Sequence, residues 1–378
     1  MLNPYVIATS QHTDPQQAVA DIAAQIDQTR LGGLIFFCSA HYPLEALARA
    51  LNQQFVGCEM AGCTSAGELT HHGYATDSLV VLGLHHDAFI MRSALIQPLS
   101  SFDRQQAALL CDQLFPAAGA GFQPLVLSLF DGLSSQEEWV LAALEAELGG
   151  IAHCGGSAAD DIHLRRTHVF YRGAFHTHAG VVIGLQTCLP FAVFSHHHLR
   201  PLHTKLVVTE ADPHQRRVYE LNGMPAAQAY AELIGQPLEQ LSPVDFALHP
   251  LAVKRGETYY VRAIQQVNHD ASLDFYCAMG KGSVLTQMYA EDLTSGLDEQ
   301  WRQLEANLGP AAFILACDCV LRRLESEERQ QQSQLAAFLR QRPLIGFNTY
   351  GEQATGVHLN HTITGFFFGY PRGLIQLT

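Results

Sequence analysis

The sequence predicts a mixed α/β protein of two domains, in which helices cover mixed sheets and one strand–helix–glycine turn–strand unit is repeated. Three observations lead to this prediction. The chain has 378 residues, which corresponds to two domains at roughly 150 residues each. Apolar residues make up 48% of the chain and charged residues 15%, enough to build a large buried core. The same order of strand, helix and glycine motif occurs three times.

The three units share every element in order. Each opens on a short apolar run that predicts a buried strand: LIFFCS (34–39), LVLSLFDG (125–132) and FILACDC (313–319). Apolar residues at three- and four-residue intervals then predict a helix, over 43–55, 137–149 and 332–341. A glycine motif follows: GCTSAGE (62–68), GGSAADD (155–161) and GFNTYGE (346–352). A second apolar strand ends each unit: LVVLGL (79–84), GVVIGL (180–185) and TGFFFG (364–369).

The glycine motifs do not match the sequences of phosphate-binding loops. They lack the spacing of GxxxxGK[ST] and of GxGxxG, and none contains the lysine of a phosphate loop. We expect each to be a turn in which glycine permits a positive φ or a close approach and Ser or Thr bonds the backbone. Equivalent turns from two halves of the molecule could also line one shared pocket.

Residues 195–310 have a different pattern, with short alternating strands separated by turn signals, and we expect antiparallel strands there. We place a domain boundary near 190–205, which gives domains at 1–195 and 205–378. The polar run ESEERQQQSQ (325–334) is interpreted as the solvated start of a helix.

Composition and charge exclude several classes of protein. A net charge of −14 with few Lys and Arg argues against nucleic-acid binding, which needs basic side chains at phosphates. No signal peptide, membrane span or basic membrane-surface helix is recognisable. The nine Cys form no CxxC pair. We therefore expect a cytoplasmic protein in which Cys38, Cys188 and Cys317 are reduced and buried.

Seven motifs in a fixed order give the chain a family resemblance. To the three glycine motifs the sequence adds LNGMPAAQAYAELIG (221–235), HPLAV (249–253), VRAIQQV (261–267) and CVLRR (319–323), and HLNHT (358–362) follows the last glycine motif. Together they resemble a protein with an N-terminal and a C-terminal FIST domain, over about 30–190 and 210–370. The resemblance implies a cytoplasmic sensory module that binds a small ligand and acts on signal-transduction proteins.

One FIST subgroup, the nitric-oxide-sensing NosP proteins, is similar to this chain in being an isolated FIST pair. That similarity implies noncovalent heme b, NO as ligand, and a partner that is a sensor histidine kinase, a diguanylate cyclase or a phosphodiesterase. It leaves open whether the chain forms a homo-oligomer.

A heme sensor needs one axial imidazole, and the chain has twenty His. We select His249 as the heme-iron ligand because Pro250 biases it toward an extended conformation. His358 and His361, which follow the third glycine motif, are further candidates for a heme pocket. The triplet His196 to His198 lies at the boundary between the domains, where we expect it to be solvent-exposed.

Two other functions are considered. A FIST module could bind an amino acid or another small organic molecule without heme, a ligand suited to glycine turns rich in Ser and Thr. An enzyme could use Ser65, Ser157 or Cys154 as nucleophile, yet the sequence lacks GxSxG, and the adjacent pair His153–Cys154 is not typical of a catalytic dyad. We therefore expect no enzymatic activity.

Overall fold

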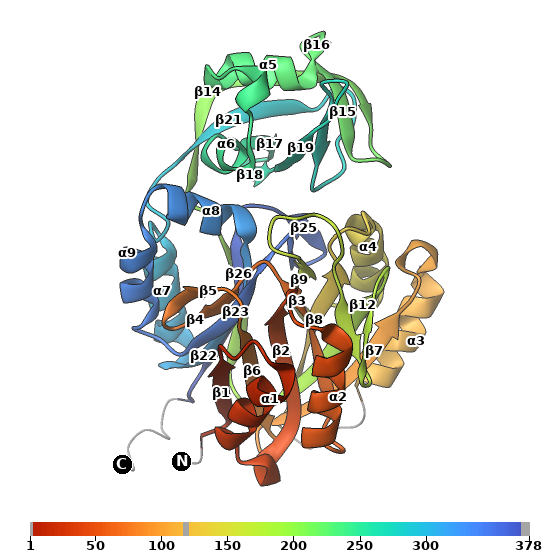
Figure 1. The fold of residues 1–378 in the computed structure, drawn as a ribbon, viewed down its shortest axis with the longest axis vertical. Coiled ribbons are helices and arrows are strands. Elements are labelled where there is room, and N and C mark those ends of the chain that lie inside the picture. The colour runs from red at the N-terminus through yellow and green to blue at the C-terminus, as the bar shows by residue number, and fades with distance from the viewer. Residues whose placement is uncertain (1–2, 116–120, 372–378) are drawn as a thin grey trace.

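The computed structural model describes residues 3–115 and 121–371. Three sheets form the body of the molecule, and residues 199–290 form a separate antiparallel sheet, here called the capping domain, over one end of that body (Figure 1). The mixed α/β class predicted from the sequence is confirmed.

The first unit contains the first long parallel strand pair of the chain. Its elements are β1 (Tyr5–Ser10), α1 (Pro15–Ala24), β2 (Leu31–Ser39), α2 (Leu44–Gln54), β3 (Met60–Ser65), β4 (Glu68–Thr70), β5 (Gly73–Ala75) and β6 (Leu79–His85). Strands β2 and β3 run parallel, from Leu34 opposite Met60 to Ser39 opposite Ser65. Helix α2 makes the crossover that a parallel pair requires. Strand β6 returns antiparallel to β2.

The second and third units repeat this order. The second contains β7 (Phe89–Ile96), α3 (Arg104–Leu114), β8 (Gln123–Asp131), α4 (Glu137–Leu148), β9 (Ala152–Ala158), β10 (Val169–Tyr171), β11 (Ala174–His176) and β12 (Gly180–Thr187). The third contains β13 (Phe191–His196), α7 (Leu297–Leu308), β22 (Ala311–Cys319), α8 (Val320–Glu328), α9 (Gln332–Leu339), β23 (Leu344–Thr349), β24 (Glu352–Ala354), β25 (Val357–Leu359) and β26 (Ile363–Gly369). The capping domain is inserted between β13 and α7.

Each unit gives its short hairpin to the sheet of another unit. The hairpin β4–β5 pairs with β23 of the third unit, β10–β11 pairs with β3 of the first, and β24–β25 pairs with β9 of the second. The resulting sheet orders are β1-β6-β2-β3-β10-β11, β25-β24-β9-β8-β12-β7 and β13-β26-β22-β23-β4-β5. The three units therefore depend on one another for complete sheets, and β13 and β4–β5 share the sheet of the third unit.

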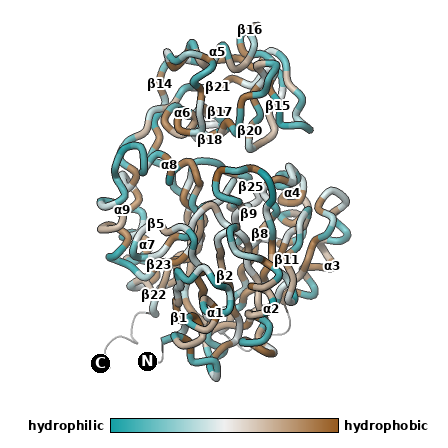
Figure 2. Tube along the Cα trace, in the orientation of Figure 1, coloured by the Kyte–Doolittle hydropathy of each residue, from teal (hydrophilic) through white to brown (hydrophobic). Residues whose placement is uncertain are grey.

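The inner strands are mainly apolar because both of their faces are covered. In β2, Ile35 and Phe37 point to a central core shared by all three sheets, while Leu34 and Phe36 pack under α1 and α2. Phe37 of the first unit stacks on Phe347 of the third, with ring centroids 4.3 Å apart. Hydrophobic residues follow these inner strands in Figure 2. The prediction that LIFFCS, LVLSLF and FILACD are buried strands is confirmed.

The glycines that open the three motifs lie in strands, which corrects the prediction of turns. A Cβ on Gly62, Gly155 or Gly346 would collide with a carbonyl oxygen of the neighbouring parallel strand. Close approach of two backbones is therefore what requires glycine at these positions. The turn itself comes at the strand end, as at Gly67.

The capping domain is an eight-stranded antiparallel sheet with two helices. Its elements are β14 (Leu199–Asp212), β15 (Arg217–Leu221), β16 (Met224–Pro225), α5 (Ala226–Ile234), α6 (Pro243–Leu248), β17 (Leu251–Arg255), β18 (Thr258–Val261), β19 (Ile264–Val267), β20 (Leu273–Phe275) and β21 (Val284–Ala290). The antiparallel strands predicted for this region are confirmed. Its edge nearest the body lies over α8, β25 and α4 (Figure 1).

Three local predictions need correction or are only partly right. Cys38 and Cys317 are buried free thiols as predicted, but Cys188 is exposed because it lies in the turn after β12. The run at 325–334 is not simply a solvated face, since Glu325 and Ser326 are buried. The His triplet is not exposed either: His198 is 1% exposed, and His196 and His197 are half-buried.

Candidate functional site

The glycine motif of the first unit lines a small cavity at the carboxyl ends of β2 and β3. In α/β sheets, ligands bind at this end of parallel strands. The cavity has a volume of about 110 Å³. Its lining residues come from all three units: Ser39, Ala40, His41, Ser65, Ala66, Gly67, Glu68, Thr76 and Asp77 from the first, Asp161 from the second and Arg323 from the third.

Glu68 is the buried acid of this cavity. Its carboxyl accepts hydrogen bonds from the hydroxyls of Ser65 and Ser78, the latter at 2.5 Å. Burial raises the pKa of Glu68 to about 7, although these hydrogen bonds and the charge of Arg323 act in the opposite direction. Near neutral pH this carboxyl can therefore offer a proton or accept one.

Arg323 is the cation of the cavity, and its side chain is only 5% exposed. Its Nη2 donates to Asp161 Oδ1 at 2.5 Å, which joins α8 of the third unit to the second unit. Its Nε lies 3.6 Å from Glu327 Oε1 but donates no hydrogen bond to any residue that the structure describes. A buried donor without a hydrogen bond is costly, so an acceptor that reached this N–H would stabilise the site.

The mouth of the cavity carries a second ion pair. His41 Nδ1 lies 2.6 Å from Asp77 Oδ1, and both side chains are more than half exposed. The hydrogen bond that His41 donates to Asp77 raises the pKa of His41. The cavity thus presents both signs of charge, together with the hydroxyls of Ser39 and Ser65.

The first unit differs from the third at this position. In the third unit Glu352 accepts hydrogen bonds from the hydroxyls of Thr349 and Thr362, the same arrangement as at Glu68, and burial raises the pKa of Glu352 to about 8. There the residue equivalent to Ala66 is Tyr350, whose hydroxyl donates to Asp160. The larger side chain fills the space beside the third strand pair.

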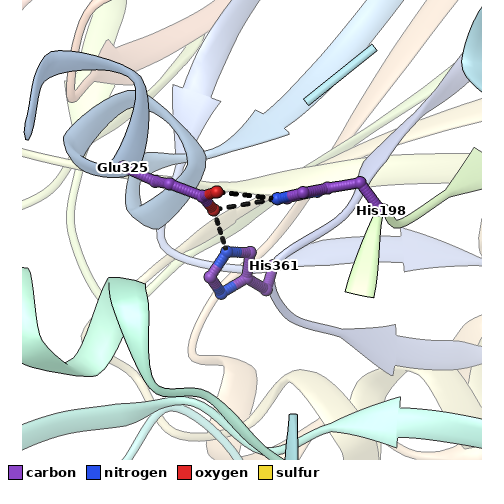
Figure 3. Close-up of side chains that lie close together, drawn as sticks. All are labelled: His198, Glu325 and His361. Atoms are coloured by element: carbon purple, nitrogen blue, oxygen red, sulfur yellow. Dashed lines mark hydrogen bonds and ion pairs between the residues drawn. The ribbon is translucent and has the colours of Figure 1, made fainter. Parts of the chain in front are cut away.

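A buried polar network surrounds Glu325, which lies two residues after Arg323 on α8. His198 Nε2 donates to Glu325 at 2.9 and 3.0 Å, and His361 Nε2 donates to the same carboxylate at 3.2 Å (Figure 3). All three side chains are fully buried. Burial would raise the pKa of Glu325, but the hydrogen bonds from both histidines lower it below its usual range.

Arg322 extends this network. Its Nη1 donates to His198 Nδ1 at 2.8 Å, and its Nε donates to Asp318 Oδ1 at 2.7 Å. The hydroxyl of Tyr74, from the exchanged β4–β5 hairpin, donates to the other oxygen of Asp318. Arg322, Asp318 and Glu325 therefore each have hydrogen-bonding or ion-pair partners inside the protein that compensate their charges.

The His198–Glu325–His361 cluster has the ligand types of a zinc site, and its ligand atoms lie within 4.8 Å of one another. The surrounding hydrogen bonds do not suit a cation. Because Arg322 donates to His198 Nδ1, the proton of neutral His198 is on Nε2, the atom that would have to bind the metal. Arg329 Nε also lies 3.4 Å from Glu325 Oε1. We therefore interpret the cluster as a hydrogen-bonded network and not as a metal site.

The three predicted heme residues have different surroundings in the structure. His358 is 3% exposed and its Nε2 bonds the carbonyl of Tyr276 at 3.1 Å. His361 is fully buried and bonds Glu325. His249 is half-buried in the capping domain, just after α6, and burial lowers its pKa. None of the three lines the cavity at Arg323.

The three residues considered as nucleophiles of an enzyme lie in different buried surroundings. Ser65 donates to Glu68, and Cys154 is fully buried, which raises the pKa of its thiol. Ser157 is buried and donates to Glu137 at 3.3 Å. His153 does meet a serine, Ser128, at 2.8 Å. Both of those residues are 0% exposed, so no substrate can reach them in this conformation.

Sequence reasoning missed Arg323, Asp161 as its partner, and the pair His198–Glu325. Arg323 stands in the CVLRR motif, but nothing in the local sequence shows that its partner is 162 residues away. Ser65 and Glu68 belong to a glycine motif that the sequence already showed. The structure places this motif in the wall of the cavity.

Comparison with known proteins identifies the domains. Residues 33–224 match the FIST N domain and residues 226–355 match the FIST C domain. An uncharacterized protein of Methanocaldococcus jannaschii, MJ1623, is 24% identical over 280 residues, which cover 68% of this chain and 54% of that protein. The chain thus spans about half the length of this curated relative.

A solved structure, that of a cyanuric acid hydrolase from A. caulinodans, aligns with 50% of this chain and 72% of that chain. The identity is 10% and the TM-score 0.26, which is too low to support any conclusion. Among the described residues, we find no helix with the length and apolar character needed to cross a membrane.

Proposed function

Because this chain belongs to the FIST family, we propose that it is a sensory protein that binds a small polar organic molecule in the cavity at Arg323. Ligand binding would regulate a signalling partner, either a sensor histidine kinase or a cyclic-di-GMP enzyme. The FIST N and FIST C architecture is that of a sensor of small ligands.

The free donor on buried Arg323 is the observation that supports this proposal most directly. A carboxylate on the ligand would pair with the guanidinium of Arg323, which lines the cavity and whose Nε donates no hydrogen bond to the described residues. Asp161 and the Glu68 carboxyl offer acceptors for an ammonium or hydroxyl group on the same ligand. A volume of about 110 Å³ limits the ligand to a few heavy atoms, the size of a small amino acid.

A thermal-shift screen tests the proposal with the twenty amino acids and a set of small carboxylates as probes. A ligand at 100 times its Kd adds about 2.7 kcal/mol to stability and raises the unfolding midpoint measurably. Arg323→Gln should abolish this shift. Arg342→Gln is the matched control, since Arg342 is also buried but pairs with Glu305 on α7. The proposal fails if no probe shifts the midpoint, or if Arg323→Gln responds as the wild type does.

Sensing of NO through heme b is kept as a second proposal, and it rests on His249 alone. His358 and His361 fit less well because both side chains are buried, although only the Nε2 of each is bonded and each Nδ1 has no partner among the described residues. His249 fits in one respect: burial lowers its pKa, which keeps the imidazole neutral as iron ligation requires. Heme, when bound, would supply an iron that binds a diatomic gas.

The visible spectrum tests the heme proposal. Protein purified from heme-supplemented cells, or mixed with hemin, should show a Soret band that responds to NO after reduction if heme is the cofactor. His249→Ala should then lose heme or shift its spectrum, with partial rescue by added imidazole. Protein that stays colourless with added hemin removes the heme proposal and leaves the cavity proposal unaffected.

A further inference from the structure

We infer that helix α8 couples the cavity at Arg323 to the attachment of the capping domain, so that a ligand in the cavity alters how the capping domain is held. This inference rests on the proposed function, because it describes how ligand binding in the cavity would change the rest of the protein. It is supported by the side chains of α8 and by the neck of the capping domain, defined as residues 198–201 and 288–291.

The neck is a two-stranded connection that α8 holds from one side. Leu199 pairs with Ala290 where β14 and β21 leave the body, and Glu291 N donates to His198 O at 3.0 Å. Glu325 of α8 accepts from the imidazole of His198. Arg329, one residue beyond α8, donates to the carbonyl of Ala290 at 3.3 Å.

Arg322 adds to this attachment. Its Nη1 donates to His198 Nδ1, and its Nη2 donates to the carbonyl of Leu293, just after the neck, at 3.3 Å. The residue beside it in sequence, Arg323, points instead into the cavity and pairs with Asp161. Two adjacent arginines on one helix thus hold the neck and the ligand cavity.

Helix α8 also packs directly on the capping domain. Ala247 of α6 lies in one apolar cluster with Val320, Leu321 and Leu324 of α8. That cluster includes Ala66, which lines the cavity, and Tyr350. A shift of α8 would therefore move contacts at the cavity and at the capping domain together.

The buried charges on α8 make it sensitive to such a shift. Arg322, Arg323 and Glu325 are each buried, and each finds its partner on another element. Removing one partner of a buried ion pair is strongly destabilising, because the other charge is left without compensation. A ligand anion that binds the Arg323 guanidinium would weaken its pairing with Asp161, which is one of the links that fix α8 to the body.

The capping domain has a second contact with the body that does not involve α8. Arg216 donates to Glu137 at 2.7 Å and also pairs with Glu138, both on α4. This contact serves as the control, because it holds the same domain but lies outside the route from Arg323 to the neck.

Amide hydrogen exchange of the full chain, followed by mass spectrometry and without ligand, tests the coupling. Arg323→Gln should speed exchange at the neck and in α6 at least about fivefold, since a coupling of ~1–3 kcal/mol corresponds to 5–150-fold. Arg323→Lys retains the charge and should return these rates toward those of the wild type. Arg216→Gln should speed exchange in α4 and around Tyr276 while residues 65–77 keep their wild-type rates.

Coupling is reciprocal, so a change at the neck must reach the cavity. His198→Leu should speed exchange at residues 65–77, whereas His198→Gln, which can still accept from Arg322 and donate to Glu325, should have a smaller effect. The inference is overturned if Arg323→Gln changes only the cavity-lining segments and the neck keeps its wild-type rates. The exchange experiment contains no ligand, so that result would disprove the coupling but leave the proposal of ligand binding in the cavity standing. Conversely, a thermal-shift screen without a hit would disprove ligand binding but leave the coupling standing.

Discussion

Glu352 holds in the third unit the position that Glu68 holds in the first. Each carboxyl accepts from the hydroxyl three residues before it and from the hydroxyl ten residues after it. Each thus joins the end of one parallel strand to the start of the last strand of its unit. Only Glu68 also lines the cavity at Arg323, so comparing the two residues separates a structural role from a role in ligand binding.

Glu352→Gln should make stability less dependent on pH. Burial raises the pKa of Glu352 from 4.5 to about 8, so the folded state keeps a proton that the unfolded state has lost above about pH 4.5. Stability therefore falls as pH rises from about 5 to 8, by on the order of 2–4 kcal/mol from this group. Urea unfolding at pH 5 and pH 8 should show a smaller loss in Glu352→Gln than in the wild type.

Glu68→Gln is the matched control for that experiment. The pKa of Glu68 is raised only to about 7, so this carboxyl should cause a smaller loss of stability as pH rises. That loss should be complete by about pH 7. Equal pH dependence in the wild type and Glu352→Gln would mean that Glu352 is ionised in the folded protein, and the account of the buried carboxyl would be wrong.

His153 should act in the opposite direction, at acid pH. Burial lowers its pKa from 6.5 to about 4, so the folded state stays neutral while the unfolded state takes up a proton below 6.5. Its contribution to stability is present above pH 6.5 and is lost as pH falls toward 4, at ~1.4 kcal/mol per pH unit.

His153→Gln tests this, since Gln can still bond Ser128 but does not titrate. Its unfolding midpoint should fall less between pH 7 and pH 4.5 than that of the wild type, even if it starts lower. A midpoint that falls as steeply as in the wild type would show that His153 is already protonated in the folded state or does not contribute.

The repeat could be predicted from the sequence because its signals are local. The strands at 34–39, 125–131 and 313–319 are short continuous apolar runs, and the period of the helices that follow is clear. The exchange of hairpins could not be predicted, since β4, β10 and β24 have three residues each and their pairing depends on distant strands.

The buried charges were missed for a related reason. The sequence VLRRLESEE of α8 has the composition of a solvated helix, but Arg322, Arg323 and Glu325 are buried because each finds a partner on another element. His198 and Glu325 are separated by 127 residues, so no spacing rule links them. For the cavity, the sequence suggested only that equivalent glycine turns could line one shared pocket.

The thiols should differ sharply in reactivity. Cys188 is exposed, whereas Cys38 and Cys317 are at most 1% exposed and burial raises the pKa of both thiols well above 9. Under native conditions iodoacetamide should modify Cys188 first, as mapped by mass spectrometry, and should reach the two buried thiols only after unfolding. Modification of Cys38 in the native protein at the rate of Cys188 would contradict the packing of β2.

Gly67 provides the last prediction, because its backbone conformation and its neighbours both require glycine. Its φ is +134°, and a Cβ there would lie 2.9 Å from Arg323 Nη1 and 3.0 Å from Asn348 Oδ1. Gly67→Ala should lower stability by about 1–3 kcal/mol through backbone strain and should displace the Arg323 guanidinium. Urea unfolding measures the first effect, and loss of the ligand-induced thermal shift measures the second.

Gly57→Ala separates strain from displacement. Gly57 also has a positive φ, +76°, but its chain neighbours apart, no described residue has an atom within 4 Å of the position of its Cβ. This variant should lose some stability through strain and keep the full ligand-induced shift. If Gly67→Ala binds ligand as well as Gly57→Ala does, then Arg323 does not need its present position, and the cavity at the end of β2 and β3 is not where the ligand binds.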